Sequence, residues 1–489
     1  MNFISGESRN QMVLMPDSVD DYVDDNNSVR VIEAYINSLD LSALGFSKPQ
    51  PNDTGRPMYD PKDLLKLYVY GYMNKIRSSR RLETETKRNL EVIWLLRKLS
   101  PDHKTIARFR QDNTTALKNV FRDFVKLCMK LNLYGKELVA IDGSKFKAVN
   151  SKDRNFTDKK LAERIARIDA KIEEYLRELE DSDSAENVIA GEKSSEEIAQ
   201  IITELAGRKE HYQTIAAELK QTGETQKSLT DPDSRLMMAN GKMDVCYNVQ
   251  SAVDAKNKMI AEFEITNCAV DKNQLTPMSE KTCATLEVQT LAVTADVGYD
   301  SVQDIVECMG NGIQPHIAGT DFDICLPSDS ESEGIVSHVN GRPVYIAERN
   351  IVLCPMGQAL HPKFYKKPHG TGIFYNCKAC AVCKRKCTAS RYRRHEVPMR
   401  ETDFTKTYND NDLIVRQVRI KPNRDIAKQR KSIVEHPFGT LKRNMDFSYC
   451  LTKGLQNVSG EFSLAFLAYN LKRAINILGT KRLIKFVSA

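Results

Sequence analysis

The sequence has no long hydrophobic run. No stretch of its 489 residues approaches the roughly 18 consecutive apolar residues expected of a membrane-spanning helix. No hydrophobic segment follows the opening residues 1–7, so we expect no signal peptide. These absences predict a protein without a membrane partner.

The sequence also has fewer cysteines for its length than a small domain that is held together by disulfide bonds. Twelve cysteines are spread over a long chain that is 41% hydrophobic, which is typical of a globular protein in a reducing compartment. A chain of this length exceeds what one hydrophobic core supports, so we expect two to four domains.

The excess of positive charge is small but unevenly distributed. The formal net charge is +7, yet residues 376–431 alone contain 16 basic and 6 acidic side chains. Residues 158–222 contain 16 acidic and 10 basic ones. The clustered basic block favours a phosphate-binding surface, with a solvated loop as the alternative.

Three acidic residues lie in contexts that suit a metal-dependent nuclease. Asp142 and Asp296 each end an apolar, strand-like run and are followed by a glycine within two residues, and Glu435 lies in a basic amphipathic segment. Carboxylates fixed at strand ends suit Mg²⁺, and two such ions can stabilise both oxygens of a phosphodiester displacement. The alternatives are plain: most of the 65 acidic residues are surface groups, and Ser432 with Glu435 also fits a helix capping box.

Periodicity divides the chain into helical and strand-rich parts. Residues 1–30 are polar, and we expect a flexible N-terminus. Residues 31–135 read as helical, with a helix beginning at Pro61 and another capped by Asp102. The second is a candidate recognition helix, with Arg108 and Arg110 available to DNA, although a plain packing helix fits equally well.

Strand patterns begin after the helical part. We expect a strand at 138–142, a hairpin of alternating strands at 243–253 and 259–265, a strand ending at Asp296, a helix at 300–309 and a strand at 312–318. The acidic segment 158–222 predicts two antiparallel helices with a break near 181–193. The apolar tail at 460–478 predicts a core helix.

Four closely spaced cysteines predict a metal site. Cys377, Cys380, Cys383 and Cys387 lie within eleven residues, and Cys354 offers a remote fifth thiol. Four thiolates are typical ligands of tetrahedral Zn²⁺, which we favour; an iron–sulfur cluster and free buried thiols remain alternatives.

Several segments, in order along the chain, resemble bacterial insertion-sequence DDE transposases. They are residues 59–72, 77–80, 101–110, 139–144, 247–254, 295–299 and 434–443. The resemblance covers about residues 30–475. In one departure, Lys428 and Lys431 hold positions where related transposases often carry Tyr and Arg ahead of the Glu, whereas Lys442 keeps the expected position after it.

The resemblance implies an α/β fold with a ribonuclease H-like mixed sheet as the catalytic core. The core would comprise residues 136–157, 228–318 and 421–480, preceded by a helical DNA-binding domain at 31–135. An acidic helical insertion at 158–227 and a Cys-rich basic insertion at 319–420 would interrupt it.

The implied activity is cleavage of DNA at the element's ends and transfer of the freed 3′-hydroxyl into target DNA. Asp142, Asp296 and Glu435 would hold Mg²⁺ or Mn²⁺. The partners would be double-stranded DNA and a second copy of the chain, in the bacterial cytoplasm at the nucleoid. A non-catalytic DNA-binding regulator derived from a transposase is the alternative. The candidate DNA contacts are Arg108, Arg110, Lys384, Arg385, Lys386, Arg391, Arg393, Arg394, Arg430, Lys431 and Lys442.

Overall fold

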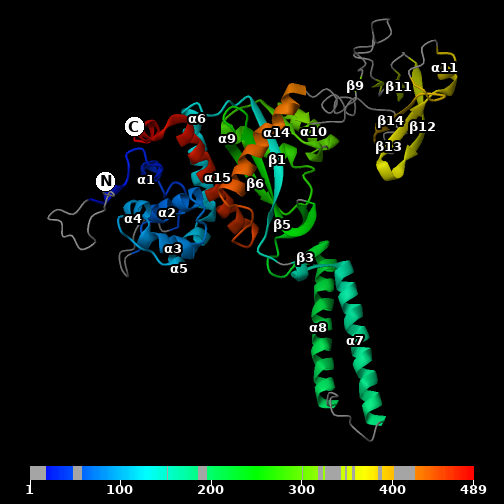
Figure 1. The fold of residues 1–489 in the computed structure, drawn as a ribbon, viewed down its shortest axis with the longest axis horizontal. Helices are drawn as coiled ribbons and strands as arrows, with labels where there is room; N and C mark the ends of the chain where they lie inside the picture. Colours follow the sequence, from blue (N-terminus) through cyan, green and yellow to red (C-terminus); the bar gives the residue numbers. More distant parts are fainter. Residues whose placement is uncertain are drawn as a thin grey trace, which may run out of the picture.

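A mixed β-sheet lies at the centre of the protein, which we describe from a computed structural model (Figure 1). The strand order is β4-β5-β1-β7-β8, with β6 also paired to β5. The structure describes residues 18–47, 58–150, 152–184, 195–239, 241–299, 301–317, 323–324, 343–346, 350–354, 358–383, 388–400 and 424–488.

The predicted strands of this sheet are confirmed, except that β1 continues beyond the expected end at Asp142 to Lys147, and β4 was not predicted. β1 pairs antiparallel with β5 and parallel with β7, and β8 extends the parallel part. The strands are β1 (Leu138–Lys147), β4 (Arg235–Ala239), β5 (Lys242–Asp254), β6 (Ile260–Thr266), β7 (Leu291–Ala295) and β8 (Ile313–Ile317).

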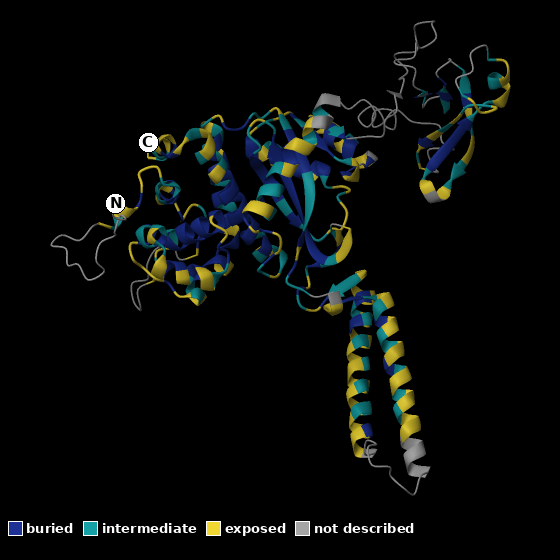
Figure 2. Ribbon diagram, viewed as in Figure 1, coloured by how far each residue is buried: buried dark blue, intermediate teal, exposed yellow. Residues whose placement is uncertain are grey.

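Helices from both ends of the chain share one hydrophobic core with the sheet. The long helix α15 (Leu455–Leu478) packs on α6, α2 and β6, and its centre is buried on all sides. Figure 2 shows this burial concentrated in the sheet and the helices beside it. The remaining helices of this body are α1 (Ser28–Ser38), α2 (Pro61–Met73), α3 (Ser79–Arg88), α4 (Leu90–Leu95), α5 (His103–Asp112), α6 (Thr114–Lys130), α9 (Leu275–Leu286), α10 (Val302–Gly310), α14 (Arg424–Gly439) and α16 (Thr480–Val487).

The predicted helix starts are confirmed in detail. Asp60 accepts a hydrogen bond from the N–H of Lys62 at the start of α2, where Pro61 is the first residue. Asp102 accepts from the N–H groups of Lys104 and Thr105 at the start of α5. Each cap satisfies N–H groups that have no partner within the helix. Among the described residues, no helix combines the length and the apolar composition needed to cross a bilayer.

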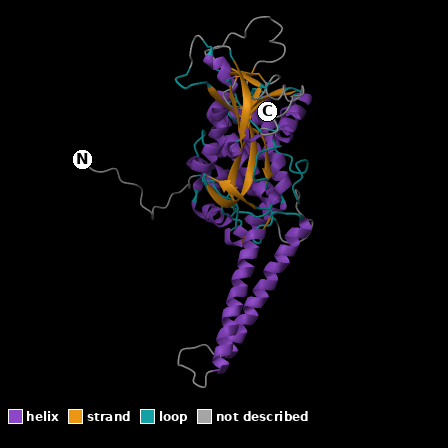
Figure 3. Cartoon of the chain, turned by 90° about the vertical axis from the view of Figure 1, so that its right-hand side faces the viewer, coloured by secondary structure: helices purple, strands orange, loops and turns teal. Residues whose placement is uncertain are grey.

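The predicted acidic hairpin extends away from the body in two views (Figures 1 and 3). It consists of α7 (Asp158–Ser184) and α8 (Ser195–Thr222), joined to the body through a two-stranded ribbon of β2 (Asn155–Thr157) and β3 (Gln226–Ser228). A small core of Phe156, Leu161, Ile215 and Leu219 closes its base. Further along, polar contacts join the helices, such as Lys209 to Asp169 at 2.6 Å.

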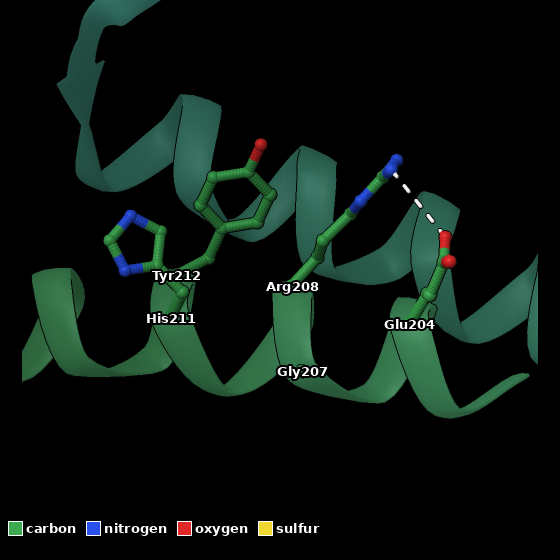
Figure 4. Close-up of a pocket in the computed structure, with 5 residues that line it drawn as sticks. All are labelled: Glu204, Gly207, Arg208, His211 and Tyr212. Carbon is green, nitrogen blue, oxygen red and sulfur yellow. Dashed lines mark ion pairs between the residues drawn. The ribbon is translucent and has the colours of Figure 1, made fainter. Parts of the chain in front are cut away.

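An open hollow of about 400 Å³ lies along the same stretch of α8. It is lined by Glu204, Gly207, Arg208, His211 and Tyr212. Figure 4 shows the four side chains on α8 and the bare backbone at Gly207. A Cβ added to Gly207 would meet no heavy atom within 4 Å. Glycine therefore weakens the helix here without serving a close contact.

We expect Gly207→Ala to stabilise the hairpin by about 1 kcal/mol, because alanine removes the entropic cost of glycine in a helix interior. Amide hydrogen exchange along α8 should slow accordingly. Gly71→Ala is the matched control, since its Cβ would lie 2.4 Å from the carbonyl oxygen of Ile76 and should destabilise α2. Unchanged exchange in α8 would contradict the prediction.

The cysteine-rich part contains a second sheet that the sequence analysis did not predict. Its strand order is β14-β13-β12-β11-β10-β9. A core of Tyr345, Val352, Cys354, Leu360, Phe374 and Val397 holds it together. The elements are β9 (Asp323–Ile324), β10 (Val344–Ile346), β11 (Ile351–Leu353), β12 (Ala359–Lys366), β13 (Thr371–Tyr375), α11 (Cys377–Ala381) and β14 (Arg394–Pro398).

Candidate functional site

Two of the predicted acids lie on neighbouring parallel strands. Asp142 is in β1 and Asp296 directly follows β7. Ala140 of β1 is opposite Thr294 of β7, so each aspartate comes two residues after the same paired position. Because side chains alternate along a strand, both aspartates belong to the sheet face of that pair. The sheet thus brings two carboxylates from distant segments to one place.

The carboxylate of Asp142 lies in a partly enclosed, negatively charged setting. Burial raises its pKa to about 6, and the nearby carboxylates of Asp296 and Asp271 act in the same direction. Arg430 opposes them, with its Nη1 3.8 Å from Asp142 Oδ1. Carboxylates held close to one another favour a bound cation, because the cation relieves their mutual repulsion.

The third predicted acid is not assembled with the other two. α14 packs across β1, β5 and β7 and buries Ile433, Val434 and Phe438 against them. Arg430, not Glu435, reaches Asp142; at 100° per residue the two side chains leave the helix about 140° apart. The side chain of Glu435 is 63% exposed, with its Oε1 3.8 Å from the Nζ of Lys431.

Within the part of the chain that the structure describes, no three His, Cys, Asp or Glu side chains converge closely enough to hold a metal ion. The capping alternative for Glu435 is wrong. α14 begins at Arg424, so Ser432 is in the helix interior, and its hydroxyl donates to the carbonyl of Gln429.

Lys442 lies within the site and not on an open surface. It belongs to a short π-helix, Thr440–Asn444, that continues α14. Its Nζ donates to Ser144 Oγ at 2.7 Å and lies 4.6 Å from the ring centre of Phe146. Burial lowers the pKa of Lys442. A cation is therefore held two residues along β1 from Asp142.

Asp271 is a carboxylate of this region that sequence reasoning missed. It follows β6 in a polar turn, 270–273, where an acid gives no signal of its own. Its charge contributes to the raised pKa values of both Asp142 and Tyr299. Only the fold brings this turn close to β1 and to the turn after β7.

The two arginines of the expected recognition helix differ in the structure. Arg108 is exposed on α5. Arg110 is buried: its Nη1 donates to the hydroxyl of Tyr72 at 3.2 Å, and its guanidinium lies over the Tyr68 ring. The expectation that Arg110 contacts DNA is therefore corrected, because packing against α2 removes it from the surface.

Three of the predicted cysteine ligands line one narrow cavity of about 10 Å³: Cys354, Cys380 and Cys383. The N–H of Gln358 donates to the sulfur of Cys354 and the N–H of Arg393 to that of Cys380, both at 3.3 Å. Cys377 is exposed. Cys387 lies outside the described residues.

The predicted cations of this module have different settings. Arg391 is exposed, and Arg394 pairs with Glu396 at 3.1 Å. The rings of Tyr375 and Tyr392 lie 4.9 Å apart beside them. Lys384, Arg385 and Lys386 lie outside the described residues.

Comparison with known proteins identifies two matching segments. Residues 17–112 match the family "Transposase domain (DUF772)", and residues 353–475 match the family "Transposase DDE domain". The second match includes Glu435 and the cysteine cluster, and neither includes Asp142 or Asp296. The resemblance of this chain to DDE transposases is thereby confirmed.

No curated protein matches the sequence. A solved structure of a piggyBac transposase synaptic complex with hairpin DNA aligns over 94% of this chain and 78% of the other chain, with 10% identity and a TM-score of 0.32.

Proposed function

We propose that this chain, two segments of which match transposase domains, is a DDE transposase. It would cleave DNA at the ends of a mobile element and join those ends to target DNA. The observation that carries this proposal is the placement of Asp142 and Asp296 on adjacent parallel strands beneath the helix with Glu435. The strand order and this helix support a ribonuclease H-like core built from residues 136–157, 228–318 and 421–480.

The residues beneath α14 fit a divalent cation. Asp142 and Asp296 supply the oxygen ligands that Mg²⁺ or Mn²⁺ prefers. Ser251, opposite Asp142, and Thr294, two residues before Asp296, have buried hydroxyl oxygens without a hydrogen-bond partner. A buried hydroxyl without a partner is costly unless another group satisfies it. When bound, the ions would stabilise the charge that develops on the attacking and leaving oxygens.

The chain's own residues would then bind and orient the DNA strand. Arg430 and Lys442 supply positive charge beside Asp142, where a scissile phosphate needs it. Glu435 completes the ligand set only if its side chain turns from Lys431 towards the aspartates. Arg430, which neutralises Asp142 in this arrangement, becomes available to a phosphate at the same time. Water would attack first, and the freed 3′-hydroxyl would attack target DNA second.

The test is incubation of the full chain with Mg²⁺ and duplex DNA that carries the element's ends. We expect strand cleavage followed by joined products, and neither product when a chelator is present. Specific binding to the ends without cleavage would instead support the regulator alternative. Concentration-dependent assembly on the ends would test the proposed homodimer.

The basic, cysteine-rich module is the proposed phosphate-binding surface. We expect Arg391→Gln, Arg393→Gln and Arg394→Gln together to weaken binding to all duplex sequences alike. Each lost phosphate contact flattens the log–log salt dependence by roughly 0.9, so three contacts remove roughly 2.7. Fluorescence anisotropy at several salt concentrations measures this slope. The same test applies to Lys384, Arg385 and Lys386.

Equal charge removed elsewhere is the control. Lys171→Gln, Arg177→Gln and Lys220→Gln change exposed residues of the acidic hairpin and should leave the slope unchanged. Arg108→Gln should instead weaken binding to the element's ends more than to random DNA, since one bidentate base contact discriminates by about 1–3 kcal/mol. An unchanged slope in the variant of Arg391, Arg393 and Arg394 would identify the basic block as a solvated loop.

A further inference from the structure

Asp271 is the centre of a hydrogen-bonded cluster beneath β1. Its Oδ1 accepts from Lys145 Nζ at 3.0 Å, Asn248 Nδ2 at 2.7 Å and Gln250 Nε2 at 2.7 Å, and its Oδ2 accepts from Lys145 at 3.2 Å. Lys145 is directly opposite Asn248, and Gly143 is directly opposite Gln250, across the β1–β5 pair. These residues share one sheet face, whereas Asp142 and Ser144 belong to the other.

Gly143 makes room for this carboxylate. A Cβ at position 143 would lie 2.3 Å from Asp271 Oδ1 and 2.4 Å from Gln250 Nε2. Real Cβ atoms essentially never show such distances, so a side chain at position 143 would displace the end of the Asp271 or Gln250 side chain. The glycine after Asp142 thus lets the Asp271 carboxylate pack directly on the backbone of β1.

The cluster also reaches the second aspartate. The hydroxyl of Tyr299, in the turn after Asp296, donates to Gln250 Oε1. The same turn approaches Asp271 at Gly298, where an added Cβ would lie 3.8 Å from Asp271 Cβ and 2.9 Å from Asp296 Oδ1. Gln250 thus bonds to Asp271 with one end of its amide and to the Asp296 turn with the other.

The donor count distinguishes two roles for Asp271. Each carboxylate oxygen has about two acceptor sites. Oδ1 of Asp271 accepts from Lys145, Asn248 and Gln250, and Oδ2 accepts from Lys145. Both oxygens of Asp271 thus contact the protein and Oδ1 is fully used, whereas Asp142 Oδ1 accepts from the N–H of Gly143 and lies 3.8 Å from Arg430 Nη1. Asp271 is therefore better suited to orienting the aspartates that would bind the metal than to binding the metal itself.

We propose that Asp271 is a positioning residue that fixes β1 and the Asp296 turn relative to each other, and so sets the spacing of the two metal-binding aspartates. The inference rests on the proposed function. Groups that orient metal ligands typically change metal affinity or activity about 10–100-fold when removed.

The test compares wild-type full-length protein with Asp271→Ala. Mn²⁺ binding is measured by electron paramagnetic resonance without DNA, and strand cleavage is measured separately. We expect both to weaken about 10–100-fold, with DNA affinity close to wild type. The thermal unfolding midpoint should fall, because the buried amides of Asn248 and Gln250 lose their bonds to Asp271. Glu264→Gln is the matched control: this carboxylate, on the neighbouring strand β6, pairs with Lys118 and Lys281 and should leave Mn²⁺ binding unchanged.

A second variant keeps the inference testable if Asp271→Ala fails to fold. Gly143→Ala disturbs the same contact from the other side and should weaken Mn²⁺ binding, but by less when Asp271 is already alanine. Equal effects of Gly143→Ala in both backgrounds, or wild-type Mn²⁺ affinity in Asp271→Ala, would overturn the inference. Failure of the wild-type protein to bind Mn²⁺ and cleave DNA would instead count against the proposed function.

Discussion

Strand cleavage should fall by several orders of magnitude when Asp142, Asp296 or Glu435 is changed to alanine, while binding to the element's ends is largely kept. In the proposed site two cations would act together, so the loss of one carboxylate would impair both and the remaining ligands would not compensate. Single-turnover cleavage of end-labelled DNA measures the rate, and gel mobility measures binding.

Glu435 is the most informative of the three variants, because the structure leaves its carboxylate exposed beside Lys431 and away from the aspartates. Asp244→Ala is the control: this residue lies in the same sheet, with its carboxylate 3.5 Å from Lys147, and should retain cleavage. Robust cleavage by Glu435→Ala would rule out a catalytic role for Glu435 while leaving the proposed roles of Asp142 and Asp296 unaffected.

About one zinc ion per chain should co-purify with the protein, held by four of Cys354, Cys377, Cys380, Cys383 and Cys387. Structural zinc contributes about 10–16 kcal/mol of apparent binding free energy in small domains, so a chelator should unfold the cysteine-rich sheet. Elemental analysis measures the metal, and circular dichroism follows the unfolding. The hydrophobic core of the second sheet is small, so a bound metal ion would contribute a large part of its stability.

Serine variants identify the ligands. Cys354→Ser, Cys380→Ser and Cys383→Ser should each release zinc, because their sulfurs line one cavity. Cys377→Ser should be tolerated better, since Cys377 is exposed, and Cys268→Ser in the main body is the neutral control. Iron with a brown chromophore would favour an iron–sulfur cluster, and a protein without metal would leave free thiols.

Local patterns sufficed for most strands of the main sheet, although not for β4 or the full length of β1, and for several helix ends. β5 and β6 alternate apolar and polar residues, and β7 ends where its apolar run meets Asp296. The helix start at Pro61 and the cap at Asp102 were predictable because both depend on residues only a few positions apart. The second sheet was missed because its strands are short and its cysteines and basic residues dominate the pattern.

Rotation of a helix about its axis was not predictable. The sequence of α14 is basic on most sides, so nothing local indicates that Arg430 contacts Asp142 while Glu435 is exposed. The burial of Val434 and Phe438 against the sheet sets that rotation. Arg110 was misjudged for the same reason: its burial depends on tyrosines of α2, almost forty residues earlier.

The sequence alone determined most strands of the main sheet, the helix start at Pro61, the Asp102 cap and the acidic hairpin, because each depends on spacing along one short segment. The tertiary structure decided which of these meet. It set Asp142 beside Asp296 through parallel pairing, and it filled the space at Gly143 with Asp271, a residue from a turn more than 120 positions later. Contacts between distant segments depend on how elements pack, and a single sequence does not encode that packing in any local pattern.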